Sequence, residues 1–197
     1  MQGESAISLR FERDNPCNTT IVDHDGNTVY TVATEFPSSG NPETHVHDGI
    51  GKLVAKWIWG DARSDLLTIG GRPQTRASAW LKKSFIPFRD DVRFLDDAGT
   101  EYTWQNNKPG LALQLFGPQS KTRPVARFIR TYKDYKADRQ NPPVVPSTLV
   151  LDESVEPIRD FIPVSFLLLE RRRRETETAT VNRAGSLAVF GQSGGFS

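Results

Sequence analysis

Residues 161–174 read FIPVSFLLLERRRR, an almost wholly apolar run that a single glutamate separates from four arginines. A hydrophobic stretch with a basic flank is typical of a membrane span with a cytoplasmic anchor. The wider apolar segment, from Ile158 to Leu169, has twelve residues. As a helix it would extend about 18 Å, whereas the hydrocarbon core of a bilayer is about 30 Å thick. We therefore expect no transmembrane span.

The same segment has the features of a helix that the protein itself must surround. Ser154 can cap it, and Glu156 and Pro157 suit its first turn. Large apolar side chains then cover every face of a helical wheel and leave no polar stripe: Phe161, Ile162, Val164, Phe166, Leu167, Leu168 and Leu169. We expect a central core helix over about residues 155–174, bent at Pro163 because proline lacks the amide that would bond to residue 159.

Most of the preceding chain has the pattern of β-strands. Ile7, Leu9 and Phe11 alternate with polar residues, which is the period of a half-buried strand. TTIVDHDGNTVYTVAT (residues 19–34) and VRFLDDAGTEYTW (92–104) each place a glycine three residues after an aspartate, a pattern that favours a hairpin. About a dozen such short runs predict a mainly β protein, an antiparallel barrel of about twelve strands that encloses the C-terminal helix.

The composition predicts one domain with two flexible ends. We expect residues 1–4 to be flexible, residues 5–174 to form a single barrel domain, and the Thr-, Gly- and Ser-rich residues 175–197 to be disordered. Ser38–Gly51 and the proline-rich residues 136–147 are predicted loops.

Charge and cysteine content limit the classes of function. Lys and Arg number 25 against 24 Asp and Glu, so the chain has no bulk positive charge for nucleic acid, and we expect no nucleic-acid partner. Cys17 is the single cysteine, which excludes an intramolecular disulfide. The first residues, MQGESAISLRFERD, lack the pattern of a secretory signal. These features predict an intracellular, cytoplasmic protein that binds membranes only peripherally. We also expect a monomer.

No motif in the sequence indicates catalysis, a metal or a cofactor. There is no G-x-S-x-G, Cys17 has no identifiable base, and Gly70-Gly71-Arg72 lacks the lysine of a phosphate loop. His45-x-His47-Asp48 offers two imidazoles and a carboxylate, but it lies in a predicted loop without a further ligand. Asp23-x-Asp25-Gly26 lacks the closing glutamate of a calcium loop. The expectation is a non-enzymatic protein with no metal and no cofactor.

The basic residues allow two interpretations. Cations after the apolar run can complement the dipole at the end of a helix, or they can form a site for anionic headgroups. The candidate headgroup ligands are Arg171, Arg172, Arg173, Arg174, Lys82, Lys83, Arg123 and Arg127. The alternative hypothesis is a protein-interaction scaffold that engages a protein partner through the Ser38–Gly51 loop or the C-terminal tail.

The order of the segments resembles a known family over about residues 5–174. The segments are ISLRF, TTIVDHDGNTVYTV, VAKWIW, LKKSF, FLDDAGTEYTW, VARF and IRDFIPVSFLLLERRRR. They resemble a fungal domain family of unknown function in the tubby C-terminal-like superfamily, which also includes the LURP-one-related proteins and the phospholipid scramblases. The resemblance implies a barrel of about twelve strands threaded by its C-terminal helix. It also implies a non-enzymatic function, the binding of phosphoinositides or other anionic membrane phospholipids.

Overall fold

The segments that alternate in the sequence form one large antiparallel sheet. The computed structural model describes residues 6–60, 64–86 and 89–191, with side chains described as far as residue 180. The first half of the sheet consists of β1 (Ala6–Phe11), β2 (Thr19–Val22), β3 (Thr28–Glu35), β4 (Glu43–Asp48), β5 (Leu53–Ile58), β6 (Leu66–Ile69) and β7 (Thr75–Arg76). After the short helix α1 (Ala77–Trp80), the second half consists of β8 (Lys82–Lys83), β9 (Val92–Leu95), β10 (Glu101–Gln105), β11 (Gln114–Phe116), β12 (Ala126–Ile129) and β15 (Thr148–Asp152).

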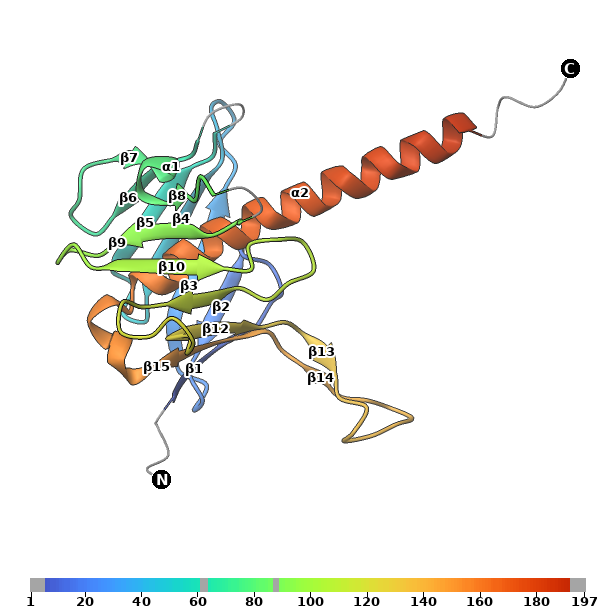
Figure 1. Ribbon diagram of the computed structural model, residues 1–197, viewed down its shortest axis with the longest axis horizontal. Helices are drawn as coiled ribbons and strands as arrows, with labels where there is room; N and C mark the ends of the chain where they lie inside the picture. Colours follow the sequence, from blue (N-terminus) through green and yellow to red (C-terminus); the bar gives the residue numbers. More distant parts are fainter. Residues whose placement is uncertain (1–5, 61–63, 87–88, 192–197) are drawn as a thin grey trace, which may run out of the picture.

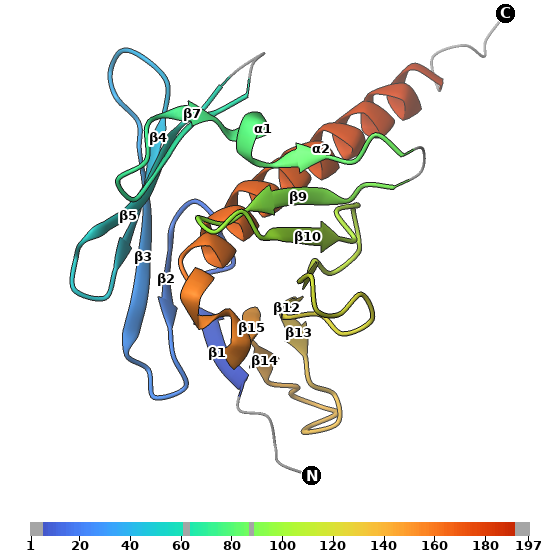
Figure 2. The same ribbon diagram turned by 60° about the vertical axis from the view of Figure 1, so that its left-hand side comes forward.

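Four further elements complete the described chain. β13 (Tyr132–Lys133) pairs with β14 (Val144–Val145) in a separate two-stranded arm that extends away from the large sheet (Figure 1). The 3-10 helix η1 (Glu153–Ile158) follows β15 and leads into helix α2 (Phe161–Gly191). In Figure 2, β3, β4 and β5 lie on one side of α2, and β9 and β10 lie on the other.

The sheet is open, so the predicted closed barrel is wrong. Its 13 strands follow the order β7-β6-β5-β4-β3-β2-β1-β15-β12-β11-β10-β9-β8, with β1 and β15 joining the two halves. Within the described chain β7 pairs only with β6, and β8 pairs only with β9. Each edge strand has two residues and α1 lies between them in the chain, so little backbone is left to close the sheet.

The first turns of α2 fill the concave side of this sheet, as the apolar run predicted. Every residue from Ile162 to Leu169 is buried, whereas Phe161 is half-buried. The Phe166 ring lies 4.5 Å from that of Phe128 on β12 and 5.6 Å from that of Phe11 on β1, measured between centroids. Burial of side chains of this size stabilises the fold by ~1.5–3 kcal/mol each before the loss of conformational entropy.

The start of the helix differs from the prediction, and the difference explains Pro163. Residues 153–158 form the 3-10 helix, and Asp152, not Ser154, caps it by accepting the Ser154 amide at 3.0 Å. Because α2 begins at Phe161, Pro163 lies in its first turn, where a backbone amide has no partner within the helix. No bend at Pro163 is therefore required.

The end of the helix also differs, because α2 continues past residue 174 to Gly191, where the sequence predicts a disordered tail (Figure 1). Residues 192–197 lie outside the described chain. The hydroxyls of Thr176, Thr178 and Thr180 each donate to the carbonyl four residues earlier, at 2.9–3.0 Å. These bonds satisfy the threonine side chains within the helix itself.

Three hairpins share one turn, of which the sequence revealed two. Asp23, Asp48 and Asp96 each accept the amides two and four residues later at one carboxylate oxygen. A glycine in the left-handed region completes each turn, at φ of +85°, +85° and +78°. The Asp48 turn joins β4 to β5, so part of the predicted Ser38–Gly51 loop is in fact a strand of the sheet.

Candidate functional site

The four arginines after the apolar run lie where α2 leaves the sheet, and they contact carboxylates of the protein itself. Arg171 and Arg173 are only 7% and 4% exposed. Arg171 Nη2 donates to the buried Asp65 at 3.2 Å, and its guanidinium lies 4.2 Å from the centroid of a ring of Trp59. Arg172 shares Asp65, at 3.4 Å.

A second buried carboxylate holds the other two arginines. Glu170 is 1% exposed and accepts from Arg173 Nη2 at 2.6 Å and from Arg174 Nε at 2.8 Å. Arg173 also donates to the Leu111 carbonyl at 3.0 Å, and Arg174 pairs with Asp14. We name Arg171–Arg174, Glu170 and Asp65 the exit cluster. Its contacts join α2 to loops from both halves of the sheet.

The exit cluster changes both interpretations of these arginines. The helix-dipole interpretation is wrong, because α2 does not end there but continues to Gly191. As headgroup ligands, Arg171 and Arg173 are poorly placed, because both are buried and each bonds a buried carboxylate. A buried ion pair loses much stability when one partner is withdrawn, so these cations are structural.

A groove lies beside the exit cluster, between β8, β9, the loop at residues 107–109 and the emerging part of α2. Its volume is about 1340 Å³. The buried side chains of Leu81, Val92 and Leu169 contribute to its lining, so its base is continuous with the core. We name it the exit groove. It brings together four of the eight predicted ligands: Lys82, Lys83, Arg172 and Arg173.

The lysines differ from the other cations of the groove in having no carboxylate partner within the part of the chain that the structure describes. Arg93 pairs with Glu101 at 3.3 Å, and Lys108 pairs with Asp90 at 3.2 Å. Lys82 and Lys83 are exposed and have no ion pair with any residue that the structure describes. Their charge is therefore available to a ligand.

An exposed aromatic residue accompanies the two lysines. Phe85 is 97% exposed and lines the groove, and the neighbouring Ile86 is 55% exposed. A large apolar side chain in water beside unpaired cations is the combination that peripheral membrane proteins present to the bilayer interface. Sequence reasoning missed Phe85, although an apolar run one residue after a lysine pair was a readable signal.

The remaining two predicted ligands lie elsewhere on the sheet. Arg127 is an exposed residue of β12 and is in register with Val150 of β15. Arg123 precedes the same strand and bonds Asp152, the cap of η1, at 3.0 Å. They provide a second, separate basic surface.

The sequence-predicted His45, His47 and Asp48 do not converge on one metal position. His45 and His47 share a face of β4, with ring centroids 6.1 Å apart, and His45 bonds Glu43 at 2.9 Å. The Asp48 carboxylate instead accepts the amides of its own turn, at 2.8 and 3.1 Å.

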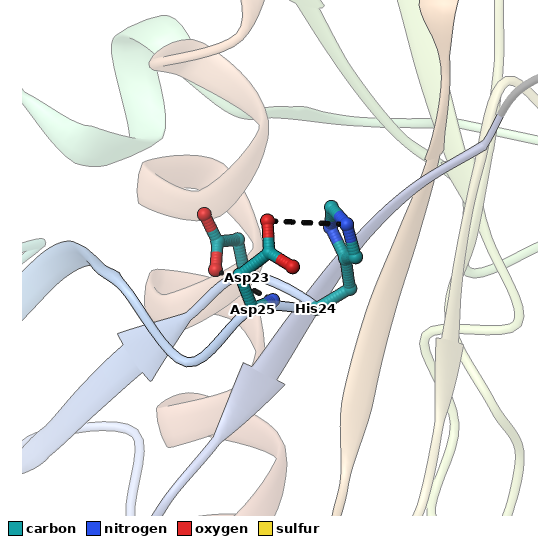
Figure 3. A group of neighbouring side chains, drawn as sticks. All are labelled: Asp23, His24 and Asp25. Carbon is teal, nitrogen blue, oxygen red and sulfur yellow. Dashed lines mark hydrogen bonds and ion pairs between the residues drawn. The ribbon is translucent and has the colours of Figure 1, made fainter.

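Asp23, His24 and Asp25 form a compact group at the tip of the β2–β3 hairpin (Figure 3). Their potential ligand atoms lie within 4.8 Å of one another. However, hydrogen bonds from the side chain and backbone of Asn27 hold the pKa of Asp23 below its usual value. The Asp23 carboxylate thus serves the turn, and we assign no metal site to this group.

A smaller cavity of about 430 Å³ lies at the opposite end of the enclosed part of α2, near Phe161. Both of its arginines have a carboxylate partner: Arg72 pairs with Asp97, and Arg159 bonds Glu156 at 3.1 Å. Beside the cavity, the Tyr30 hydroxyl donates to Asp160 at 2.7 Å. Burial raises the pKa of Tyr30, and the bond to Asp160 raises it by a smaller amount. These paired groups stabilise the start of α2.

Across the described residues, no helix is both long enough and apolar enough to span a bilayer.

These features define the class of protein: a mainly β domain whose open antiparallel sheet surrounds the first turns of a long C-terminal helix. The chain belongs to the family of unknown function DUF6593, which it matches over residues 14–175. Among solved structures it is similar to the X-ray structure of a protein from Arabidopsis thaliana, at 15% identity. That similarity covers 85% of this chain and 91% of that chain, with a TM-score of 0.39. No curated protein sequence matches the chain.

Proposed function

We propose that this protein binds peripherally to anionic phospholipid through the exit groove. Lys82 and Lys83 contact the phosphate groups, and Phe85 contacts the apolar part of the interface. One observation carries the proposal: two exposed lysines without a carboxylate partner among the described residues lie beside a 97% exposed phenylalanine on an apolar groove.

The magnitudes support reversible attachment. Each lysine near an anionic leaflet contributes ~1 kcal/mol. Full burial of the Phe85 side chain contributes ~1.5–3 kcal/mol. Together they give about 4 kcal/mol, which is comparable to one weak lipid anchor. Binding is therefore expected to fall steeply with salt, because the lysines are exposed to screening.

Co-sedimentation with vesicles tests the proposal. Vesicles of phosphatidylcholine alone are compared with vesicles that also hold phosphatidylserine or a phosphoinositide, at low and physiological salt. We expect binding only to the anionic vesicles, and loss of binding for the double variant Lys82→Gln/Lys83→Gln.

The matched control removes the same charge from the other basic surface. Arg123→Gln/Arg127→Gln is expected to retain vesicle binding, because these side chains lie outside the groove. Loss of binding in this variant alone would move the site to β12. Equal, salt-insensitive absence of binding to all vesicles would reject the proposal.

The projecting part of α2 favours a second candidate function, a protein-interaction scaffold. Glu175, Thr176 and Thr178–Thr180 are exposed on a helix that extends beyond the sheet (Figure 1). Deletion of residues 181–197 retains Glu177, which pairs with Arg173 of the exit cluster at 3.3 Å. If the deletion leaves all protein interactions unchanged, this candidate fails.

The relationship to the tubby C-terminal-like superfamily and a fungal origin remain part of the proposal, together with a cytoplasmic location. The order of the quoted segments and the enclosed C-terminal helix support the relationship. Fluorescence microscopy of the tagged protein in fungal cells tests the location. We expect cytosolic signal with a membrane fraction that the Lys82→Gln/Lys83→Gln variant lacks.

A further inference from the structure

We infer that the exit groove takes up one acyl chain, so that the protein holds a single anionic lipid molecule as well as contacting the membrane surface. This inference rests on the proposed function and deepens it by assigning the ligand class, a monomeric amphiphile with one phosphate and one acyl chain in the groove.

The size and base of the groove are the first argument. Its volume of about 1340 Å³ exceeds the 300–1,000 Å³ of ordinary small-molecule pockets. Leu81, Val92 and Leu169, which contribute to its base, are each at most 4% exposed. A surface contact with phosphate alone needs no hollow that reaches the core, whereas an acyl chain does.

The helical wall is the second argument. Thr176, Ala179 and Thr180 line the groove from α2, at the spacing that places residues on one face of a helix. All three side chains are small. The threonine hydroxyls donate to carbonyls of α2 itself, so they do not require a partner from a ligand. A small, internally satisfied wall suits a hydrocarbon chain.

The charges at the groove are the third argument. Its two acidic residues are already paired, Asp90 with Lys108 at 3.2 Å and Glu175 with Arg171 at 2.9 Å. Lys82 and Lys83 remain as the cations that can hold a phosphate. An apolar groove beside the two lysines is complementary to an anionic amphiphile and not to a neutral one.

The test measures monomer uptake separately from vesicle binding. Delipidated full-length protein is titrated calorimetrically with lysophosphatidic acid below its critical micelle concentration, with chains of increasing length, and with inorganic phosphate. We expect affinity to rise by up to about fourfold for each added methylene that enters the groove. Inorganic phosphate is expected to bind far more weakly.

Groove-filling variants supply the structural control. Ala179→Trp and Thr176→Trp each place a large ring in the groove, and both positions are exposed, so the core is not disturbed. Each is expected to weaken lysophosphatidic acid binding at least tenfold while vesicle co-sedimentation persists. Thr178→Trp, at an exposed position of the same helix that does not line the groove, is expected to change neither, and thermal unfolding confirms that all three variants fold.

The outcomes separate the inference from the proposed function. Vesicle binding without monomer binding overturns the inference and leaves the proposed function intact. Affinity that is independent of chain length, or insensitive to both groove-filling variants, also overturns it. Absence of both kinds of binding rejects the inference and the proposed function together. Equal binding of inorganic phosphate and lysophosphatidic acid overturns the inference alone.

Discussion

The exit cluster and the lysine pair of β8 are two basic regions that border the same groove, yet their charges have different roles. The arginines bond Glu170 and Asp65, two buried carboxylates, and fix the position at which α2 leaves the sheet. The lysines stand on an edge strand, where no described residue provides such a partner. A dense run of cations is therefore not the same as available positive charge. Availability depends on carboxylates that the fold brings near.

The largest expected effect comes from removal of the carboxylate at the centre of the exit cluster. Glu170→Ala leaves the buried Arg173 without its closest partner, which should lower the free energy of unfolding by about 3–5 kcal/mol. Urea denaturation measures the loss. Glu101→Ala, which removes the carboxylate of the exposed ion pair with Arg93, is the control and should cost less than about 1 kcal/mol. Similar small losses in both variants would remove the structural role assigned to the cluster.

Cys17 provides the next test, because Arg171 and Arg174 of the exit cluster act electrostatically on this single thiol. Burial raises its pKa from 9.0 to about 11, and the opposing effect of Arg171 is smaller. At pH 8 its thiolate fraction should be about a hundredfold lower in the folded protein than in the unfolded chain. Native protein should react correspondingly slowly with a thiol reagent, and rapidly in urea. Equal rates would mean that the fold does not shield the Cys17 thiol from water.

Substitution of the lysines should separate binding from stability. Lys82→Gln/Lys83→Gln removes two contributions of ~1 kcal/mol each, so affinity for anionic vesicles should fall about 30-fold. Its unfolding free energy should stay within about 0.5 kcal/mol of wild type, because neither side chain is buried. A large loss of stability would contradict the contrast between the two regions.

The smallest expected effect concerns pH. Desolvation raises the pKa of Glu177, but the Gly110 amide, Arg173 and Arg130 together lower it by more. The net result is a pKa below the usual value of 4.5. A carboxyl group with a lowered pKa stabilises the fold above its unfolded pKa and loses that contribution as pH falls through the folded value. Stability should therefore decline slightly below about pH 4.5, and Glu177→Gln should flatten this part of the profile. An unchanged profile would exclude Glu177 as a contributor.

Much of the fold was predictable because it depends on local patterns. The apolar run was too short for a bilayer and had no polar face, which required enclosure by protein, and Phe166 and Leu168 are fully enclosed. The open edge was not predictable, since two-residue strands leave no periodic signal. β4 was missed because its outward histidines and glutamate resemble a loop, while only Thr44 and Val46 are buried.

The site was predictable only in part. The lysine pair could be selected from charge, but the partners of the arginines could not, because Asp14 and Asp65 are more than 100 residues away in sequence. The wall of the groove lies on a segment whose Thr-rich composition predicted disorder. Its helical form depends on the preceding turns, which are already fixed in the sheet and remove the cost of nucleation.

The pairing of β1 with β15 has a consequence for biosynthesis. β1 leaves the ribosome long before its partner β15, and the helix that fills the interior is made after both. Until then the nascent chain exposes the apolar lining of an empty half-shell, a state prone to aggregation. Because β1 pairs with a strand far away in sequence, the contact order is high and we expect slow folding. Pulse-labelled hydrogen exchange during refolding would reveal it as late protection of β1. During synthesis, we expect the chain to depend on a holding chaperone.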